Sequence, residues 1–280
     1  MKKQILSIAS LSCSTVLAAS AALAQEQEPV PTVEAPALEC PGFSVFADFS
    51  SRQITRGLPD NEEPFATVGV SAEWYGLSFE VDWLYDLTDE RNLDGEYNEI
   101  DYIIGYGYDF SPDDWHLPTT IALAADWTYE YHPDDPFTHY IHASIGLPDL
   151  WLAPSLESEF EMRDACRYFA LSFSHSWDLI EAREEDGTPV LSLTLSVAQG
   201  LANDKQNDAD LGKDFWALRD TTFTAQLDWT PVENLTISPY IAYGDTYSGT
   251  IRKAAHYYTD GENRNDVSQI YGGVVVSASF

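Results

Sequence analysis

The fold is decided by the stretch Val267-Ser268-Gln269-Ile270-Tyr271-Gly272-Gly273-Val274-Val275-Val276-Ser277-Ala278-Ser279-Phe280. Apolar residues and glycine recur at every second position from Ile270 to Phe280, and polar residues occupy most positions between them, with Val275 as the exception. A period of two with one apolar face predicts a β-strand. This pattern suits the closing strand of a barrel, but equally an edge strand of a soluble sheet, so the remaining sequence must decide.

The rest of the chain repeats this alternation in segments of about ten residues separated by turn residues. The clearest segment alternates Leu77, Phe79, Val81, Trp83 and Tyr85 with polar and acidic residues. The predicted strands cover residues 43–54, 65–74, 77–86, 97–110, 119–131, 137–147, 150–162, 166–177, 190–198, 215–229, 235–243 and 267–280. We therefore predict an all-β fold, a closed antiparallel transmembrane β-barrel of about 12 strands.

The predicted connections alternate between short turns and longer polar loops, as a barrel requires. The longest loops span residues 200–213 and 247–266, and the segment 178–189 is one connection that is longer than the pattern predicts. Short turns are expected on the periplasmic side and long loops on the outside.

Outward aromatic residues fall into two groups under this topology, one at each end of the strands. Such belts mark the two interfaces of a lipid bilayer, and a soluble β-sandwich has no reason to sort its aromatics in this way. The expected periplasmic belt holds Trp74, Tyr108, Phe110, Trp177, Trp229 and Phe280, and the outer belt holds Tyr85, Trp127, Tyr129, Tyr131 and Tyr243.

The N-terminal region predicts export. Lys2 and Lys3 precede a short apolar stretch, and Ala22-Leu23-Ala24 matches a small-x-small cleavage site. We expect a signal peptide at 1–24, a flexible periplasmic lead-in at 25–41 and an outer-membrane barrel at 42–280. The residues before Cys13 fit a lipoprotein site poorly, because the usual Leu three positions earlier is missing.

Charge and cysteine content limit the possible partners and disulfides of the protein. Without Lys2 and Lys3 the chain keeps 12 basic residues against 46 acidic ones, so the mature formal charge is 12 − 46 = −34. Such acidity argues against nucleic acid as a partner. The predicted topology places Cys40 and Cys166 at opposite rims, beyond the roughly 7 Å that a disulfide allows between α-carbons, so we expect no bridge between them.

The inward face carries the candidate functional residues. A carboxylate-lined lumen favours cations or polyhydroxylated neutral solutes, which predicts a porin-like channel for passive diffusion of small solutes. The alternative is that barrels simply fill a polar interior with charges, and that side chains plug a barrel of this size. The predicted pore-lining residues are Arg52, Arg56, Glu80, Asp82, Asp86, Glu99, Asp101, Asp126, Glu130, Glu157, Glu159, Glu161 and Asp228.

We expect no catalytic residue, no metal site and no cofactor. The oxygen-rich segments 60–63 and 89–90 could hold a divalent cation, but they lack the spacing of a calcium loop. Solvated acidic loops are the favoured alternative, and divalent ions could merely bridge them to lipopolysaccharide. A serine hydrolase needs a Ser–His pair, but Ser174 and Ser176 point to the face opposite His175, and His175 is expected to be an interfacial histidine. His142 points inward. Because no Ser–His pair is evident, a membrane-embedded hydrolase is only the third alternative. A channel comes first, and a plugged barrel with a structural or surface-interaction role comes second.

Three short motifs between residues 50 and 102 carry a resemblance to a known family. Residues 50–57, Ser-Ser-Arg-Gln-Ile-Thr-Arg-Gly, are followed by Gly-Leu-Ser-Phe-Glu at 76–80 and Asn-Glu-Ile-Asp-Tyr at 98–102. This order resembles an uncharacterised family of bacterial outer-membrane β-barrel proteins with an Arg-Gly motif after the first strand. The resemblance implies a barrel in the outer membrane and brings no substrate or catalytic residues. A pairing of Arg52 or Arg56 with Glu80, Glu99 or Asp101 would make the motif a structural clasp.

The closing strand looks like that of bacterial outer-membrane barrels. There a terminal aromatic, here Phe280, resembles the signal read by the barrel-assembly machinery. The expected partners are therefore this machinery, outer-membrane lipid and lipopolysaccharide, and small solutes.

Overall fold

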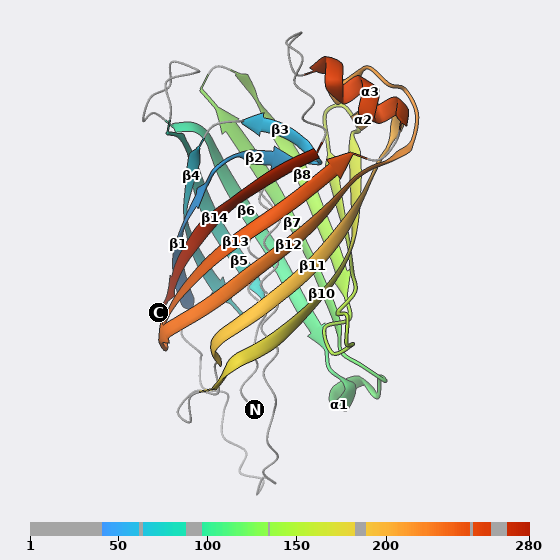
Figure 1. The fold of residues 1–280 in the computed structure, drawn as a ribbon. Helices are drawn as coiled ribbons and strands as arrows, with labels where there is room; N and C mark the ends of the chain where they lie inside the picture. The colour runs from blue at the N-terminus through green and yellow to red at the C-terminus, as the bar shows by residue number, and fades with distance from the viewer. Residues whose placement is uncertain are drawn as a thin grey trace, which may run out of the picture.

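The computed structural model describes residues 41–61, 64–87, 97–133, 135–182, 189–246, 249–258 and 268–280. Twelve strands close into one barrel in the order β1-β14-β13-β12-β11-β10-β9-β8-β7-β6-β5-β4 (Figure 1). They are β1 Gly42–Ser50, β4 Phe65–Trp74, β5 Leu77–Asp86, β6 Tyr97–Phe110, β7 Ile121–His132, β8 Asp135–Gly146, β9 Ser155–Glu161, β10 Arg167–Ala182, β11 Pro189–Ala202, β12 Ala217–Val232, β13 Leu235–Thr246 and β14 Ser268–Ser279. The predicted all-β, closed antiparallel barrel of twelve strands is confirmed.

The barrel closes where the first and last strands meet. β1 pairs antiparallel with β14 from Ser44↔Ser279 to Ser50↔Gly273, and with β4 on its other side. The Phe43 amide donates to the Phe280 carbonyl at 3.2 Å, and the Phe280 amide donates to the Phe43 carbonyl at 2.8 Å. The ring therefore has no open edge, which is how a barrel satisfies its backbone groups.

The two rims of the barrel differ. The rim near the C-terminus carries tight connections, such as the Tyr75-Gly76 turn, and the one-turn helix α1 Pro112–Trp115 (Figure 1). The opposite rim carries helices α2 Asp204–Leu211 and α3 Gly249–Tyr258 and a two-stranded hairpin of β2 Gln53–Thr55 and β3 Leu58–Asn61. We call this second rim the outer mouth, following the predicted orientation.

Several predicted strand ends are wrong. The first strand ends at Ser50 rather than Ile54, because Ile54 and Leu58 are buried in the hairpin instead of facing outward. The seventh begins at Ser155 rather than Leu150, after Pro154, since proline cannot donate to a sheet. β10 and β11 stay paired up to Ala182↔Pro189. Their connection is therefore shorter than the predicted 178–189.

Two segments predicted as polar loops contain helices. In α2 the Asn203 side chain accepts from the Gln206 amide at 2.8 Å, and Gly212 ends the helix with a φ of 63°. Both are standard capping residues, so this helix had a local sequence signal. α3 lies within the predicted loop 247–266.

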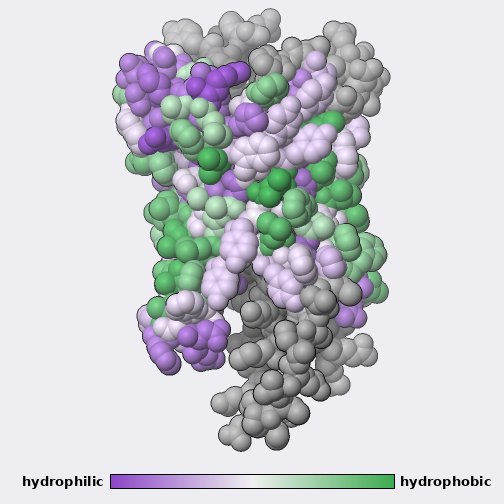
Figure 2. All heavy atoms as spheres, turned by 180° about the vertical axis from the view of Figure 1, so that it is seen from behind, coloured by the Kyte–Doolittle hydropathy of each residue, from purple (hydrophilic) through white to green (hydrophobic). Residues whose placement is uncertain are grey.

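The outside of the barrel is apolar and the inside is polar. Along β5, for example, Phe79 is half exposed while its neighbours Glu80 and Asp82 are buried. Figure 2 shows apolar residues gathered at mid-height on one face, with polar residues toward both ends. Lipid is the surrounding that accommodates such an exterior. None of the described helices is long and apolar enough to cross a membrane.

Aromatic side chains gather near both rims. Near the C-terminal rim, Phe110 packs edge-on against Tyr108 and Trp115, with ring centroids 4.8 and 5.3 Å away. Toward the outer mouth, Tyr129 lies 6.0 Å from Tyr102 and 5.5 Å from Phe137. These clusters have the places predicted for two interfacial belts.

Candidate functional site

Carboxylates cover one wall of the barrel interior. Asp82, Asp86 and Asp101 have no exposed surface, and Glu80 is 7% exposed. The strand register places Asp82 beside Asp101 and Asp101 beside Glu130, so three strands present acids side by side. This acidic wall consists of Glu80, Asp82 and Asp86 on β5, Glu99 and Asp101 on β6, Asp126 and Glu130 on β7, and Glu157, Glu159 and Glu161 on β9.

The wall built by β10 to β13 presents neutral hydroxyl groups instead. Ser176 and Thr194 are hydrogen-bonded at 2.7 Å across β10 and β11. Asp228, predicted to join the acidic residues, lies on this second wall, where it accepts from the Ser238 hydroxyl at 2.6 Å and the Gln226 amide at 2.7 Å. The structure therefore separates Asp228 from the other predicted acids.

A hairpin crosses the outer mouth. Arg56 and Gly57 form its two-residue turn with φ values of 49° and 77°, between the paired residues Thr55 and Leu58. Two positive φ values define a type I′ turn, which asparagine and glycine normally occupy. Arginine at the first position is uncommon there, and the backbone conformation therefore does not account for its presence.

The Arg56 side chain reaches the far wall. Its Nη2 lies 3.3 Å from Oε1 of Glu159 on β9, which stands six places from β1 in the ring of twelve in either direction. A Cβ at Gly57 would lie 2.4 Å from Cβ of Asp220 on β12, so the turn touches that strand too. The hairpin thus spans the lumen. Arg56 has a partner other than the three carboxylates named in the sequence prediction, and Arg52 lies half-buried in the link between β1 and β2.

Helices α2 and α3 pack beside the hairpin at the outer mouth. Leu58 of the hairpin, Leu211 of α2 and Ile251 of α3 form one buried apolar cluster. Ion pairs hold the helices to the barrel: Arg219 of β12 with Asp210 of α2, and Arg252 of α3 with Asp245 of β13 at 2.8 Å. We call the hairpin and the two helices the cap.

Basic residues lie at this end only, within the described part of the chain. All nine described lysines and arginines belong to the outer mouth or the cap; they are Arg52, Arg56, Arg163, Arg167, Lys205, Lys213, Arg219, Arg252 and Lys253. Acidic residues such as Glu73, Asp109 and Glu157 continue along the interior toward the other rim. Within the described chain the lumen therefore holds many more acidic than basic residues, and its lysines and arginines lie at the outer end, where Arg56 pairs with Glu159.

The two histidines considered for catalysis lie on different faces. His142 Nδ1 lies 2.7 Å from Asp126 Oδ1 inside the barrel, and the nearby Thr128 hydroxyl is 3.5 Å from the same nitrogen. His175 faces outward, where its Nδ1 contacts the Trp151 carbonyl at 2.6 Å and its ring packs on Trp177. His175 thus faces outward, as the sequence predicted, and its interfacial role stays a prediction.

A cluster with metal-ligand chemistry lies near the outer mouth, which the sequence prediction missed. One ligand atom each from Glu99, Glu130 and His132 lies within 4.8 Å of the others. The signal was present in the sequence, since Glu130 and His132 share one face of a strand. What could not be seen was that Glu99 on β6 faces them. The segments 60–63 and 89–90, considered for cation binding, lie outside the side chains that the structure describes.

The remaining features are peripheral to the lumen. Cys166 is a buried free thiol in the β9–β10 turn; Cys40 and residues 1–24, the predicted signal peptide, lie outside the described residues. Phe280 is 76% exposed at the rim opposite the cap. Its role as an assembly signal stays a prediction.

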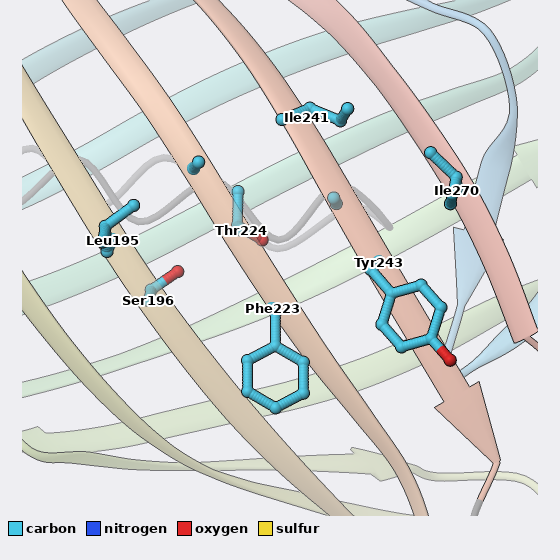
Figure 3. Close-up of a pocket in the computed structure, with 9 residues that line it drawn as sticks. Leu195, Ser196, Phe223, Thr224, Ile241, Tyr243 and Ile270 are labelled. Carbon is cyan, nitrogen blue, oxygen red and sulfur yellow. The ribbon is translucent and has the colours of Figure 1, made fainter.

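An apolar groove lies on the outer surface over β11 to β14 (Figure 3). Leu195, Phe223, Ile241, Tyr243 and Ile270 line it. Ile241 and Ile270 are 58% and 67% exposed, so the groove belongs to the lipid-type exterior and not to the lumen.

Comparison with known proteins does not identify the function of this chain. No protein-family model and no curated protein matches the chain, so the resemblance to an uncharacterised family stays a prediction. Among solved structures, the KdgM porin in complex with disordered oligogalacturonate is 9% identical, with a TM-score of 0.48, covering 85% of this chain and 99% of its own.

Two further structures have similarly low sequence identity to this chain. The NanC porin is 10% identical with a TM-score of 0.47, over 84% of this chain and 98% of its own. The outer membrane channel DcaP of Acinetobacter baumannii is 9% identical with a TM-score of 0.39, over 86% of this chain and 96% of its own. At these values the likeness carries no argument about the function of this chain.

Proposed function

We propose that this protein is a porin-like channel of the bacterial outer membrane, which passes small solutes through a cation-favouring lumen. The observation that carries the proposal is the acidic wall, a set of inward carboxylates on β5, β6, β7 and β9 inside a closed barrel. A lumen with one sign of charge concentrates counter-ions and excludes ions of the same sign. The proposed pore-lining residues are the thirteen that the sequence predicted.

The outer membrane is the proposed location because the barrel exterior is apolar and its aromatic residues gather near both rims. Lipid and lipopolysaccharide would surround such a surface, and assembly there would require the barrel-assembly machinery. No catalytic residue enters the proposal. The hydroxyl wall of β10 to β13 adds neutral donors and acceptors, which suits polyhydroxylated solutes as well as hydrated cations.

The test is the conductance of the refolded protein in a planar bilayer under a salt gradient. The proposal expects steady single-channel currents and a reversal potential that shows cation preference. Neutralising acids of the wall, as in Glu157→Gln with Glu80→Gln, should weaken that preference. The matched control is Glu233→Gln in the β12–β13 turn, which lies outside the lumen. Anion preference in the wild type would contradict the proposal.

A second function is favoured by the cap: a plugged barrel with a structural or surface-interaction role. The hairpin spans the lumen from β1 to β9, and the two helices pack against it. A variant with residues 53–61 replaced by a short Gly-Ser linker separates the two. Wild-type currents favour the channel, whereas currents that appear only after the replacement favour the plug.

A further inference from the structure

We infer that Glu99, Glu130 and His132 form a binding site for a divalent transition-metal ion at the outer end of the acidic wall. Glu99 lies near the start of β6, and Glu130 and His132 lie at the end of β7, the strand paired with it. Alternation along β7 places Glu130 and His132 on one face. His132 Nε2 lies 3.7 Å from Glu130 Oε2.

The geometry suits a small ion. The three ligand atoms lie within 4.8 Å of one another. Two ligands bound at about 2.1 Å each can be at most about 4.2 Å apart. The difference is a few tenths of an ångström, which side-chain rotation supplies in residues that are only half-buried.

A separate observation points to a cation at this place. Asp101 has no exposed surface, and the neighbouring side chain within hydrogen-bonding reach of its carboxylate is that of another acid, Glu99. Its strongest electrostatic neighbours are Glu99, Glu130 and Asp82, which are all acids. Burying a carboxylate without a donor or a positive charge is costly. A bound cation would offset the charge of the whole group.

The donor set selects the class of ion. Carboxylates alone suit Ca²⁺ and Mg²⁺, whereas an imidazole with two carboxylates suits Zn²⁺ and its first-row neighbours. His132 would bind through its neutral ring, with Glu99 and Glu130 as oxygen ligands. Asp101 is a positioning residue that adds negative charge behind the ligands. The site would hold its ion whether or not the lumen conducts.

The experiment uses the untagged, refolded full barrel in detergent, titrated with Zn²⁺ by calorimetry and with Co²⁺ by visible absorption. We expect one tight equivalent of Zn²⁺, and a Co²⁺ spectrum that shows nitrogen ligation. His132→Gln should abolish that spectral signature and weaken Zn²⁺ binding by about tenfold or more. Glu99→Gln and Asp101→Asn should weaken binding without removing the nitrogen signature. All variants are first checked for the heat-resistant folded band.

The matched control is His116→Asn, which removes an imidazole at the opposite rim. His116 has a φ of 53°, a conformation that asparagine tolerates. Its Zn²⁺ affinity should equal that of the wild type. Zn²⁺ binding unaffected by His132→Gln would overturn the inference. Ca²⁺ binding as tight as Zn²⁺ binding would also overturn it, because the acids would then only be attracting any divalent cation. The absence of Zn²⁺ binding would overturn it too, because protons would then neutralise these carboxylates. Failure here leaves the channel proposal standing, because conductance is measured separately.

Discussion

The Arg56 guanidinium lies 3.3 Å from the Glu159 carboxylate, although β9, which carries Glu159, stands opposite β1 in the barrel. The two side chains are only 16% and 19% exposed. Breaking a fully buried pair by removing one partner costs about 3–5 kcal/mol, and this partly exposed pair should cost less. The pair therefore holds the hairpin across the lumen.

Arg56→Asn is the sharpest test of that role. Asparagine is favoured at this turn position, so it removes the backbone strain of a positive φ at position 56. The same substitution removes the ion pair with Glu159. We expect the folded band of the variant to disappear at a lower temperature on heating. We also expect its conductance to be larger and more cation-selective. The control is Arg52→Gln, which removes a positive charge from the same segment. An Arg56→Asn protein with unchanged stability and current would show that the pair does not hold the hairpin.

Gly57→Ala should destabilise the cap more than Gly212→Ala. Both glycines have positive φ values, 77° and 63°, so both substitutions carry a similar backbone cost of about 1 kcal/mol. Only at Gly57 would the new Cβ collide with Asp220, at 2.4 Å, since nothing lies within 4 Å at Gly212. Urea unfolding of both variants measures the difference. Equal losses would mean that the hairpin moves away from β12 freely.

The Cys166 thiol should react slowly with a disulfide reagent at pH 8. Burial, with the neighbouring Glu161 carboxylate, raises the pKa of Cys166 to about 12, and the thiolate is the reactive form. The measurement uses the chain from Gln25 with Cys40→Ser, which removes both Cys13 and Cys40, so that a single thiol is followed. Glu161→Gln should speed the reaction. Rapid labelling of the folded parent protein would contradict a buried, protonated thiol.

Asp149 should stabilise the barrel in a pH-dependent way. It accepts from the Thr120 amide at 2.8 Å, and hydrogen bonds from Thr120 and Thr119 lower the pKa of this carboxyl. Because the folded pKa is depressed, the contribution is present above the unfolded value of about 3.9 and is lost as pH falls through the folded value. The melting temperature of wild type should exceed that of Asp149→Asn at pH 6.

That gap should close on acidification below about pH 4. Asp178→Asn is the control, as an exposed carboxylate on a neighbouring strand near the same rim. A gap for Asp149→Asn that stays constant down to pH 2 would mean that its carboxylate charge is not what stabilises the turn.

The sequence by itself determined the barrel, because a period of two is a local property of each strand. Phe79 and Glu80 must face opposite sides whatever their neighbours are, so the inward acids and outward aromatics followed directly from the sequence. The strand number and the closing pair of β1 and β14 followed from the repetition of that pattern. Turn residues such as Pro154 and Gly212 carried further local signals.

Only the tertiary structure decided what the interior residues meet. Which residues lie together inside depends on register and on chain segments that cross the lumen, and neither is encoded in local alternation. Thus Arg56 meets Glu159 more than a hundred residues later, Glu99 meets His132, and Asp228 joins the hydroxyl wall instead of the acids. Ile54 likewise is buried because it belongs to the hairpin strand β2 and not to the outward face of β1.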